Sequence, residues 1–547
     1  MALRDIDWIR ATPIWASLTL LLSMWLVFLL PTWNMALTHW LGFSQDEITL
    51  SLELQLATAV NAGMFSLLPA SLACERVGPM AGALGCATLT TLGWTLFALG
   101  SIGAVEYSRS WLTVYLYLTG AGSGAAFATA MHVVACNVRS EAVIEAVGVL
   151  ASCFFYQSIV YTAITQTVFS GNVYYDWIMP VRHLICAGVA FLCAPALFVI
   201  PSRGSAGGEG DRVGADTFLA RPLSAAIVIG VLLAAGPWLI RAGNYNNSMP
   251  TFYIAWTGRI FVSVCWFAAV FATVALTACL AHRYGARALL SLRGPLGHKL
   301  LDGGAPAADK EVQQQPAEDS ASFLADSEST ALYVRAARET SFWSMWVSQG
   351  VGFFACTIVA NYLLTLVNAE GAVDDDTDDG FSVLSYAHIK DSVTALHWGI
   401  KTLAPLFWSH AVARWEAGGA ADARRTPLAL LGANSLLMAA ALVLFLICPV
   451  RWVYLPTALS ALAIGGYYTL PPLVLVHWHG AGALGAVWGT LMLSGLAAQL
   501  PQALILSDAS SCKGDMGCFI GSFLSLAVLL CCTGAWALRH QRVPRSG

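Results

Sequence analysis

The sequence predicts an all-α polytopic membrane protein. Of its 547 residues, 57% are hydrophobic and only 11% are charged, whereas soluble domains carry about 25% charged residues. Stretches of about 20 mostly apolar residues, the length that crosses a bilayer core, recur between residues 14 and 538. They lack the alternation of a membrane β-barrel, and backbone groups in lipid must be hydrogen-bonded internally. We therefore expect each stretch to be a helix.

The apolar stretches predict about fourteen transmembrane helices, grouped as six, two and six; twelve is the alternative count. They lie near residues 14–36, 49–72, 80–103, 111–135, 142–166, 180–200, 222–241, 258–281, 342–366, 390–411, 426–448, 452–476, 482–506 and 518–538. The expected domains are an N-terminal six-helix bundle (1–200), a cytoplasmic connector (201–221), two additional helices (222–281), a flexible cytoplasmic linker (282–340) and a C-terminal six-helix bundle (341–547).

The distribution of charge predicts the orientation, because cytoplasmic loops collect Lys and Arg. With the N-terminus inside, twenty of the 28 basic residues fall on one side, and the acidic run from Asp374 to Asp379 falls on the other. Both termini are then cytoplasmic. The net charge of −4 is small and argues against a nucleic-acid partner. The sequence does not distinguish the plasma membrane from an organelle membrane.

Two features are predicted on the exoplasmic side. Cys512 and Cys518 flank the loop before the last helix, and we expect a disulfide there if that face is oxidising; the alternative is two free thiols. Asn246 begins a glycosylation sequon between the seventh and eighth helices. The other cysteines lie in or beside helices, where cysteine usually serves as a small apolar residue.

Lys401 is the strongest candidate for a functional residue, because a charge inside a transmembrane helix costs about 2.5–3.5 kcal/mol on insertion scales. At about 100° per residue, Lys390, Thr394, His397 and Lys401 share one face of their helix. We expect this face to line the substrate pathway, with Lys401 attracting an anionic group and His397 tuning its charge or relaying a proton. The alternative is that Lys401 pairs internally and only fixes packing.

Further polar residues in the predicted helices are weaker candidates for the pathway, since each alone is more often an interhelical hydrogen bond than a ligand. They are Tyr156, Gln157, Tyr161, Asn361, Tyr467, Tyr468, Gln499 and Gln502.

No catalytic set, metal site or cofactor is predicted. No Ser/His/Asp set or Cys/His pair is gathered in one region, so we expect a non-enzyme. The pair His477 and His479 is a weak metal motif without a third ligand. A site for metal transport would require the scattered His132, His397, His410 and His477 to converge.

The loop between the second and third helices carries a family resemblance. Glu75, Arg76, Val77 and Gly78 resemble the acidic-Arg-x-Gly motif of the major facilitator superfamily, with Glu75 where that family has Asp. Three segments resemble the nodulin-like branch of that superfamily. The pair Gly399 and Lys401 also resembles it, with Lys401 where that branch has Arg. The segments are Leu41 to Gln45, the glycines Gly120, Gly122 and Gly124, and Cys512 to Phe519.

The resemblance implies two six-helix bundles that rock around a central site. It also implies that Glu75, Arg76 and Gly78 help to close the cytoplasmic side, in part through contact with a helix terminus; the alternative is a charge that only sets topology. We therefore expect a secondary transporter of a small organic anion or similar metabolite, with protons as a candidate coupling ion. The alternatives are a transporter of a metal ion or metal chelate and a non-transporting membrane sensor.

Overall fold

In a computed structural model, all regular elements in the part of the chain that the structure describes are helices, as expected from the sequence. The structure describes residues 8–23, 50–101, 104–105, 108–167, 220–243, 249–290, 331–369, 383–417, 426–448, 452–509 and 517–539. Seven of these helices are long and apolar enough to cross a membrane. The expected helix at 180–200 lies outside the described residues.

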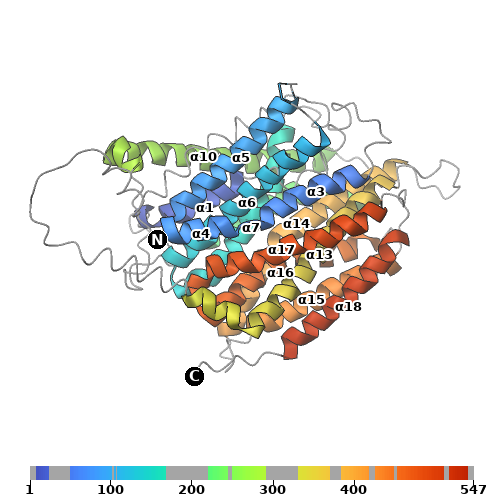
Figure 1. The fold of residues 1–547 in the computed structure, drawn as a ribbon. Helices are drawn as coiled ribbons and strands as arrows, with labels where there is room; N and C mark the ends of the chain where they lie inside the picture. The colour runs from blue at the N-terminus through green and yellow to red at the C-terminus, as the bar shows by residue number, and fades with distance from the viewer. Residues whose placement is uncertain are drawn as a thin grey trace, which may run out of the picture.

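The first half of the fold consists of the helices α1 to α7 (Figure 1). They are α1 (Trp8–Ser23), α3 (Leu50–Phe65), α4 (Leu68–Val77), α5 (Pro79–Ser101), α6 (Arg109–Asn137) and α7 (Val143–Thr167). The stretch expected as one helix at 49–72 is two helices, because α3 ends at Phe65 and α4 starts at Leu68 with a proline in its first turn. Gly78 ends α4 with a φ of 108°, which favours glycine.

The second half consists of α13 to α18. They are α13 (Thr340–Ala369), α14 (Val383–Ala417), α15 (Thr426–Ile447), α16 (Tyr454–His479), α17 (Ala486–Ala509) and α18 (Gly517–Arg539). Residues 282–290 at the end of the helix Met249–Leu290 and residues 331–338 are also helical, so both ends of the segment predicted as a flexible linker have regular structure. Pro405 lies inside α14, and Pro471 and Pro472 lie inside α16.

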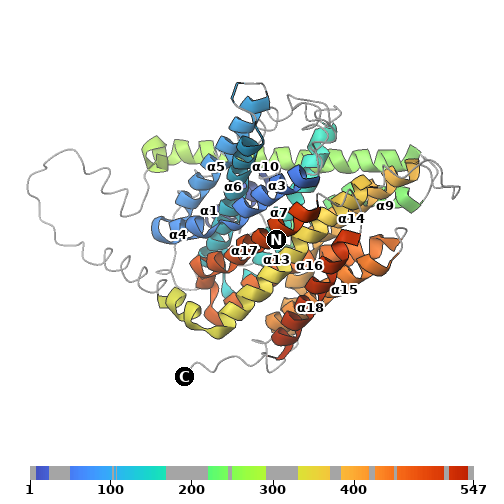
Figure 2. The same cartoon turned by 45° about the vertical axis from the view of Figure 1, so that its right-hand side comes forward.

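Between the halves lie α9 (Ala220–Gly243) and α10 (Met249–Leu290), close to the expected additional pair. The two helices pack on each other, and both pack on α7. Helix α9 also packs on α14, so it contacts both halves. The long α10 runs past its neighbours at one side of the molecule (Figure 2).

The two halves meet along two seams. One is the α7–α14 seam, and the other is formed by α3 and α4 with α17. Within the first half α6 packs on both α3 and α5, and within the second half α15 packs on both α16 and α18. The buried core is continuous across both seams.

Candidate functional site

The α7–α14 seam is tight because small residues face it. A Cβ added to Gly148 on α7 would overlap the Ser409 side chain on α14. The Ser152 hydroxyl donates a hydrogen bond of 2.5 Å to the carbonyl of Thr402. The two helices run in opposite directions, so the next turn of α7 brings Phe155 to Lys401. The seam therefore places a side chain of the first half against the lysine of the second.

Lys401 is buried, and its ammonium group lies over two aromatic rings. Its Nζ lies 4.8 Å from the ring centroid of Phe155 on α7 and 4.6 Å from that of Trp398 on its own helix. Rings at this distance attract a cation through their negative faces. Only 7% of Lys401 is exposed, and it is the only Lys, Arg, Asp or Glu among the buried residues that the structure describes. The interface between the halves thus holds a positive charge in an apolar setting.

The polar face predicted for α14 is partly realised. His397, one turn before Lys401, is 6% exposed, and its Nδ1 has no hydrogen-bond partner in the described part of the chain. Thr394 is half-buried on the same face. Pro405 has no N–H, so the carbonyl of Lys401 loses its usual helical donor. A buried His and a Pro-interrupted helix at the same level are typical of functional positions in membrane helices.

An aromatic cluster continues from Phe155 into the second half, with Tyr468 at its centre. The Tyr468 ring centroid lies 5.0 Å from Phe155, 6.0 Å from Phe154 and 5.2 Å from Phe353. Phe65 continues the chain of contacts, 4.6 Å from Phe353. These residues come from α3, α7, α13 and α16. The rings therefore pack on one another across the interface between the halves.

Other predicted pathway residues are bonded elsewhere. The Tyr467 hydroxyl donates to Ser435 at 3.1 Å, and Gln499 donates to Thr357 at 3.4 Å. Gln157 donates to the carbonyl of Phe154. The Tyr156 hydroxyl lies against Gly230 of α9 and not against Lys401.

Several residues that the sequence predicts as sites lie outside the part of the chain that the structure describes. They are Asn246, Cys512 and the side chains of Tyr161, Asn361, Gln502 and Cys518.

At the second seam, the loop motif contacts the start of α17. Glu75 Oε1 accepts a hydrogen bond of 2.5 Å from the backbone N–H of Ala486, the first residue of that helix. A helix N-terminus favours a negative group. A Cβ on the adjacent Gly485 would overlap the Glu75 carboxylate, so glycine allows this approach. Arg76 is exposed. Glu75 therefore contacts the start of α17, while closure of the cytoplasmic side by Glu75, Arg76 and Gly78 stays a prediction.

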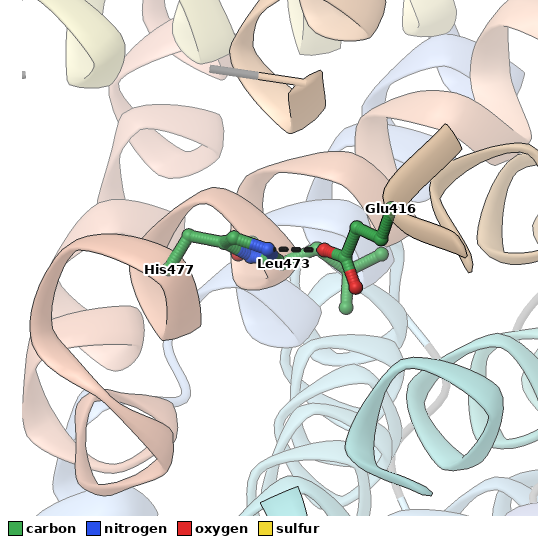
Figure 3. Close-up of polar contacts among 3 residues, drawn as sticks. All are labelled: Glu416, Leu473 and His477. Atoms are coloured by element: carbon green, nitrogen blue, oxygen red, sulfur yellow. Dashed lines mark hydrogen bonds and ion pairs between the residues drawn. The ribbon is translucent and has the colours of Figure 1, made fainter. Parts of the chain in front are cut away.

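The His477 and His479 pair is joined to carboxylates. His477 on α16 contacts Glu416 at the end of α14 through Nε2, while its Nδ1 lies 2.9 Å from the carbonyl of Leu473 (Figure 3). His479 lies 3.8 Å from Glu339. Among the described residues, no three His, Cys, Asp or Glu side chains are gathered as a metal site would require. The convergence needed for metal handling is therefore not seen there.

Comparison with known proteins identifies the fold. No protein-family model matches the chain, and no curated protein sequence matches it. Among solved structures, the proton:xylose symporter XylE of E. coli is similar with a TM-score of 0.53 and 13% identity, over 98% of this chain and 96% of that one. The human organic anion transporter MFSD10 has a TM-score of 0.52 and 14% identity, over 96% and 99%. A POT family transporter in complex with 5-aminolevulinic acid has a TM-score of 0.52 and 10% identity, over 97% and 96%.

The chain has the major facilitator fold. Sequence identities this low establish only the fold. That fold agrees with an integral membrane protein built from two helical halves. In the major facilitator fold described here, Lys401 lies at the interface of those halves.

The sequence did not point to Phe155, Trp398 or the glycines of the seams as parts of this site. Aromatic residues are too frequent in membrane helices for single ones to be selected. The small residues Gly148, Gly485 and Gly489 carried a usable signal, since small residues mark close helix contacts. Without a partner helix, however, their spacing does not say what they contact.

Proposed function

We propose that the protein is a secondary active transporter that moves a small organic anion by alternating access. The single observation that supports this most is Lys401, a buried cation held at the interface of two halves by a ring from each. Sites between two helical repeats near the bilayer midplane are where such proteins bind substrates. The nodulin-like branch, fourteen spans and cytoplasmic termini belong to the same proposal.

Protons are the coupling ion in this proposal. His397 is buried one turn from Lys401, and its Nδ1 has no partner among the described residues. Imidazole exchanges protons near neutral pH, so it can link the charge beside the substrate to a proton gradient. We expect His397→Gln to reduce the dependence of uptake on an imposed pH gradient while retaining downhill flux.

The test is uptake of labelled organic anions into proteoliposomes by the intact protein, Lys401→Met and Lys401→Arg. Lys401→Met keeps the length of the side chain but removes the charge, and we expect it to lose at least about tenfold in transport, because the anion is left without its cation. Lys401→Arg keeps the charge and should retain part of the activity.

His410→Ala is the matched control, because His410 is an exposed residue on the same helix. It should leave transport unchanged. If Lys401→Met folds and transports like the intact protein, Lys401 has only a structural role. Specific binding without accumulation under any gradient would favour a sensor over a transporter.

A further inference from the structure

We propose that the substrate is an arylalkyl monoanion, with one carboxylate or sulfonate on a short chain that ends in an aromatic ring. This inference rests on the proposed transport function and names the class of anion. It comes from two properties of the site around Lys401. Among the described residues Lys401 is the one buried side chain of the types Lys, Arg, Asp and Glu, and two aromatic rings lie against its ammonium group.

The charge of the site matches one anionic group. Lys401 is the only Lys, Arg, Asp or Glu among the buried side chains of the described residues, and the other buried polar groups are hydroxyls, amides and His397. A monoanion bound to Lys401 is neutralised. A dianion leaves its second charge desolvated without a partner, which costs more than a single pair returns.

The body of the site is aromatic. The ammonium group of Lys401 lies over the rings of Phe155 and Trp398, and Phe155 in turn contacts Tyr468 and Phe154. Sugars and dicarboxylates need several converging donors and acceptors. An aromatic ring instead gains from offset or edge-to-face contact with other rings. The walls that this chain offers therefore favour a flat apolar body over a hydroxylated one.

The same rings occupy the ammonium group of Lys401 in the present state. A carboxylate interacts with a buried ammonium more strongly than a ring face does, so it can displace Phe155 from Lys401. Phe155 then loses a cation contact and gains a partner if the ligand carries a ring. A ligand without a ring does not give Phe155 a new aromatic partner in place of the lost cation contact.

Four ligands separate charge from ring in a binding experiment with the purified full-length protein in detergent, by calorimetric titration. They are 3-phenylpropionate, its neutral amide 3-phenylpropanamide, propionate and phenylsuccinate. We expect 3-phenylpropionate to bind at least about tenfold more tightly than each of the others, since one ring contact and one paired charge are each worth about that much. The comparison is made on the unsubstituted protein, so it does not depend on a variant folding.

Variants then assign the two contributions to residues. Lys401→Met should remove the advantage of 3-phenylpropionate over its amide. Phe155→Leu should reduce the advantage over propionate and leave the charge discrimination intact. Trp398→Leu provides the same test at the second ring if Phe155→Leu is poorly folded. The exposed His410→Ala should bind all four ligands as the unsubstituted protein does.

Each outcome decides between the class of anion and transport itself. Propionate or phenylsuccinate binding as tightly as 3-phenylpropionate would overturn the aryl monoanion class. If none of the four binds and proteoliposomes accumulate another anion, this inference fails and the transport function stands. Selective binding of 3-phenylpropionate, with no accumulation of any ligand, supports the class and removes the transport function.

Discussion

The hydrogen bond between Glu75 and Ala486 depends on Gly485, because a side chain at that position would overlap the Glu75 carboxylate. The Glu75 carboxylate receives the N–H of Ala486 at 2.5 Å, and Gly485 beside it leaves the space that the carboxylate fills. When a backbone N–H at a helix N-terminus loses its hydrogen-bond acceptor, the protein is destabilised by about 0.5–2 kcal/mol. The contact joins residues 411 positions apart in the sequence, so it stabilises one arrangement of the halves.

We predict that Gly485→Ala lowers the thermal unfolding temperature in detergent, because its methyl group displaces the Glu75 carboxylate. The expected loss is about 1–2 kcal/mol. Gly482→Ala is the control, since a Cβ there meets only Leu332 at 3.7 Å, an ordinary contact. Equal stability of the two variants would mean that the Glu75 contact contributes little.

At the scale of single elements, α14 and α16 are each interrupted by proline where they carry site residues. Pro405 follows Lys401 by four positions, as Pro471 and Pro472 follow Tyr467 and Tyr468. A proline removes the helical hydrogen bond to the carbonyl four residues earlier. Such helices bend more easily than uninterrupted ones, so both helices are weakened at the level of the candidate site.

We predict that Pro405→Ala slows uptake several-fold without lowering stability, because it restores the donor to the Lys401 carbonyl and stiffens α14. Initial rates in proteoliposomes and thermal unfolding measure the two effects. Pro427→Ala is the control, since Pro427 lies in the first turn of α15, where no N–H donor is needed. Unchanged uptake by Pro405→Ala would show that bending at this position is not used.

Helix α9 is a third partner of the α7–α14 seam. The Tyr156 hydroxyl packs so closely against Gly230 of α9 that a Cβ at Gly230 would overlap it. We predict that Gly230→Val destabilises the protein by about 1–3 kcal/mol through overpacking and lowers uptake. Gly521→Val is its control, because a Cβ at Gly521 meets nothing within 4 Å. If both variants unfold alike, α9 is not held through Tyr156.

At the scale of single helices, the sequence predicts well the features that depend on a local pattern of residues. Most of the described apolar helices were found within a few residues, because about 20 apolar residues in lipid have one stable conformation. Helices α10 and α14 extend six to nine residues beyond both predicted ends. The break between α3 and α4 was missed, since Pro69 in the first turn of α4 is compatible with either a kink or a new start. Lys401 was selected from the sequence because a buried charge is costly, and its role in the pathway stays a prediction. Its ring partners were not selected, because they depend on the packing of α7 against α14.

For the whole molecule, the two seams show that the halves are in contact at the end that the charge distribution assigns to the cytoplasm. Gly148 meets Ser409 at one seam, and Gly489 meets Ser71 at the other. Alternating access requires both contacts to separate when the site opens to that side. A covalent link across either seam should therefore prevent the cycle.

We predict that the double variant Ser71→Cys with Gly489→Cys forms a disulfide on mild oxidation. A Cβ at Gly489 would lie 3.0 Å from that of Ser71, so a small adjustment reaches the usual spacing of about 3.8 Å. Uptake should stop on oxidation and return on reduction. Each single variant is a control for the natural cysteines. Continued uptake by the cross-linked protein would contradict rocking of the halves at this seam.

The length of α10 has a mechanical consequence. Its apolar span ends at Cys279, and the helix continues over residues 280–290, a further rise of about 16 Å at about 1.5 Å per residue. The helix therefore carries the chain beyond its apolar span and into the segment 282–340 that was expected to be a flexible linker. Because α10 also packs on α7, a force applied to this extension acts on a helix of the α7–α14 seam.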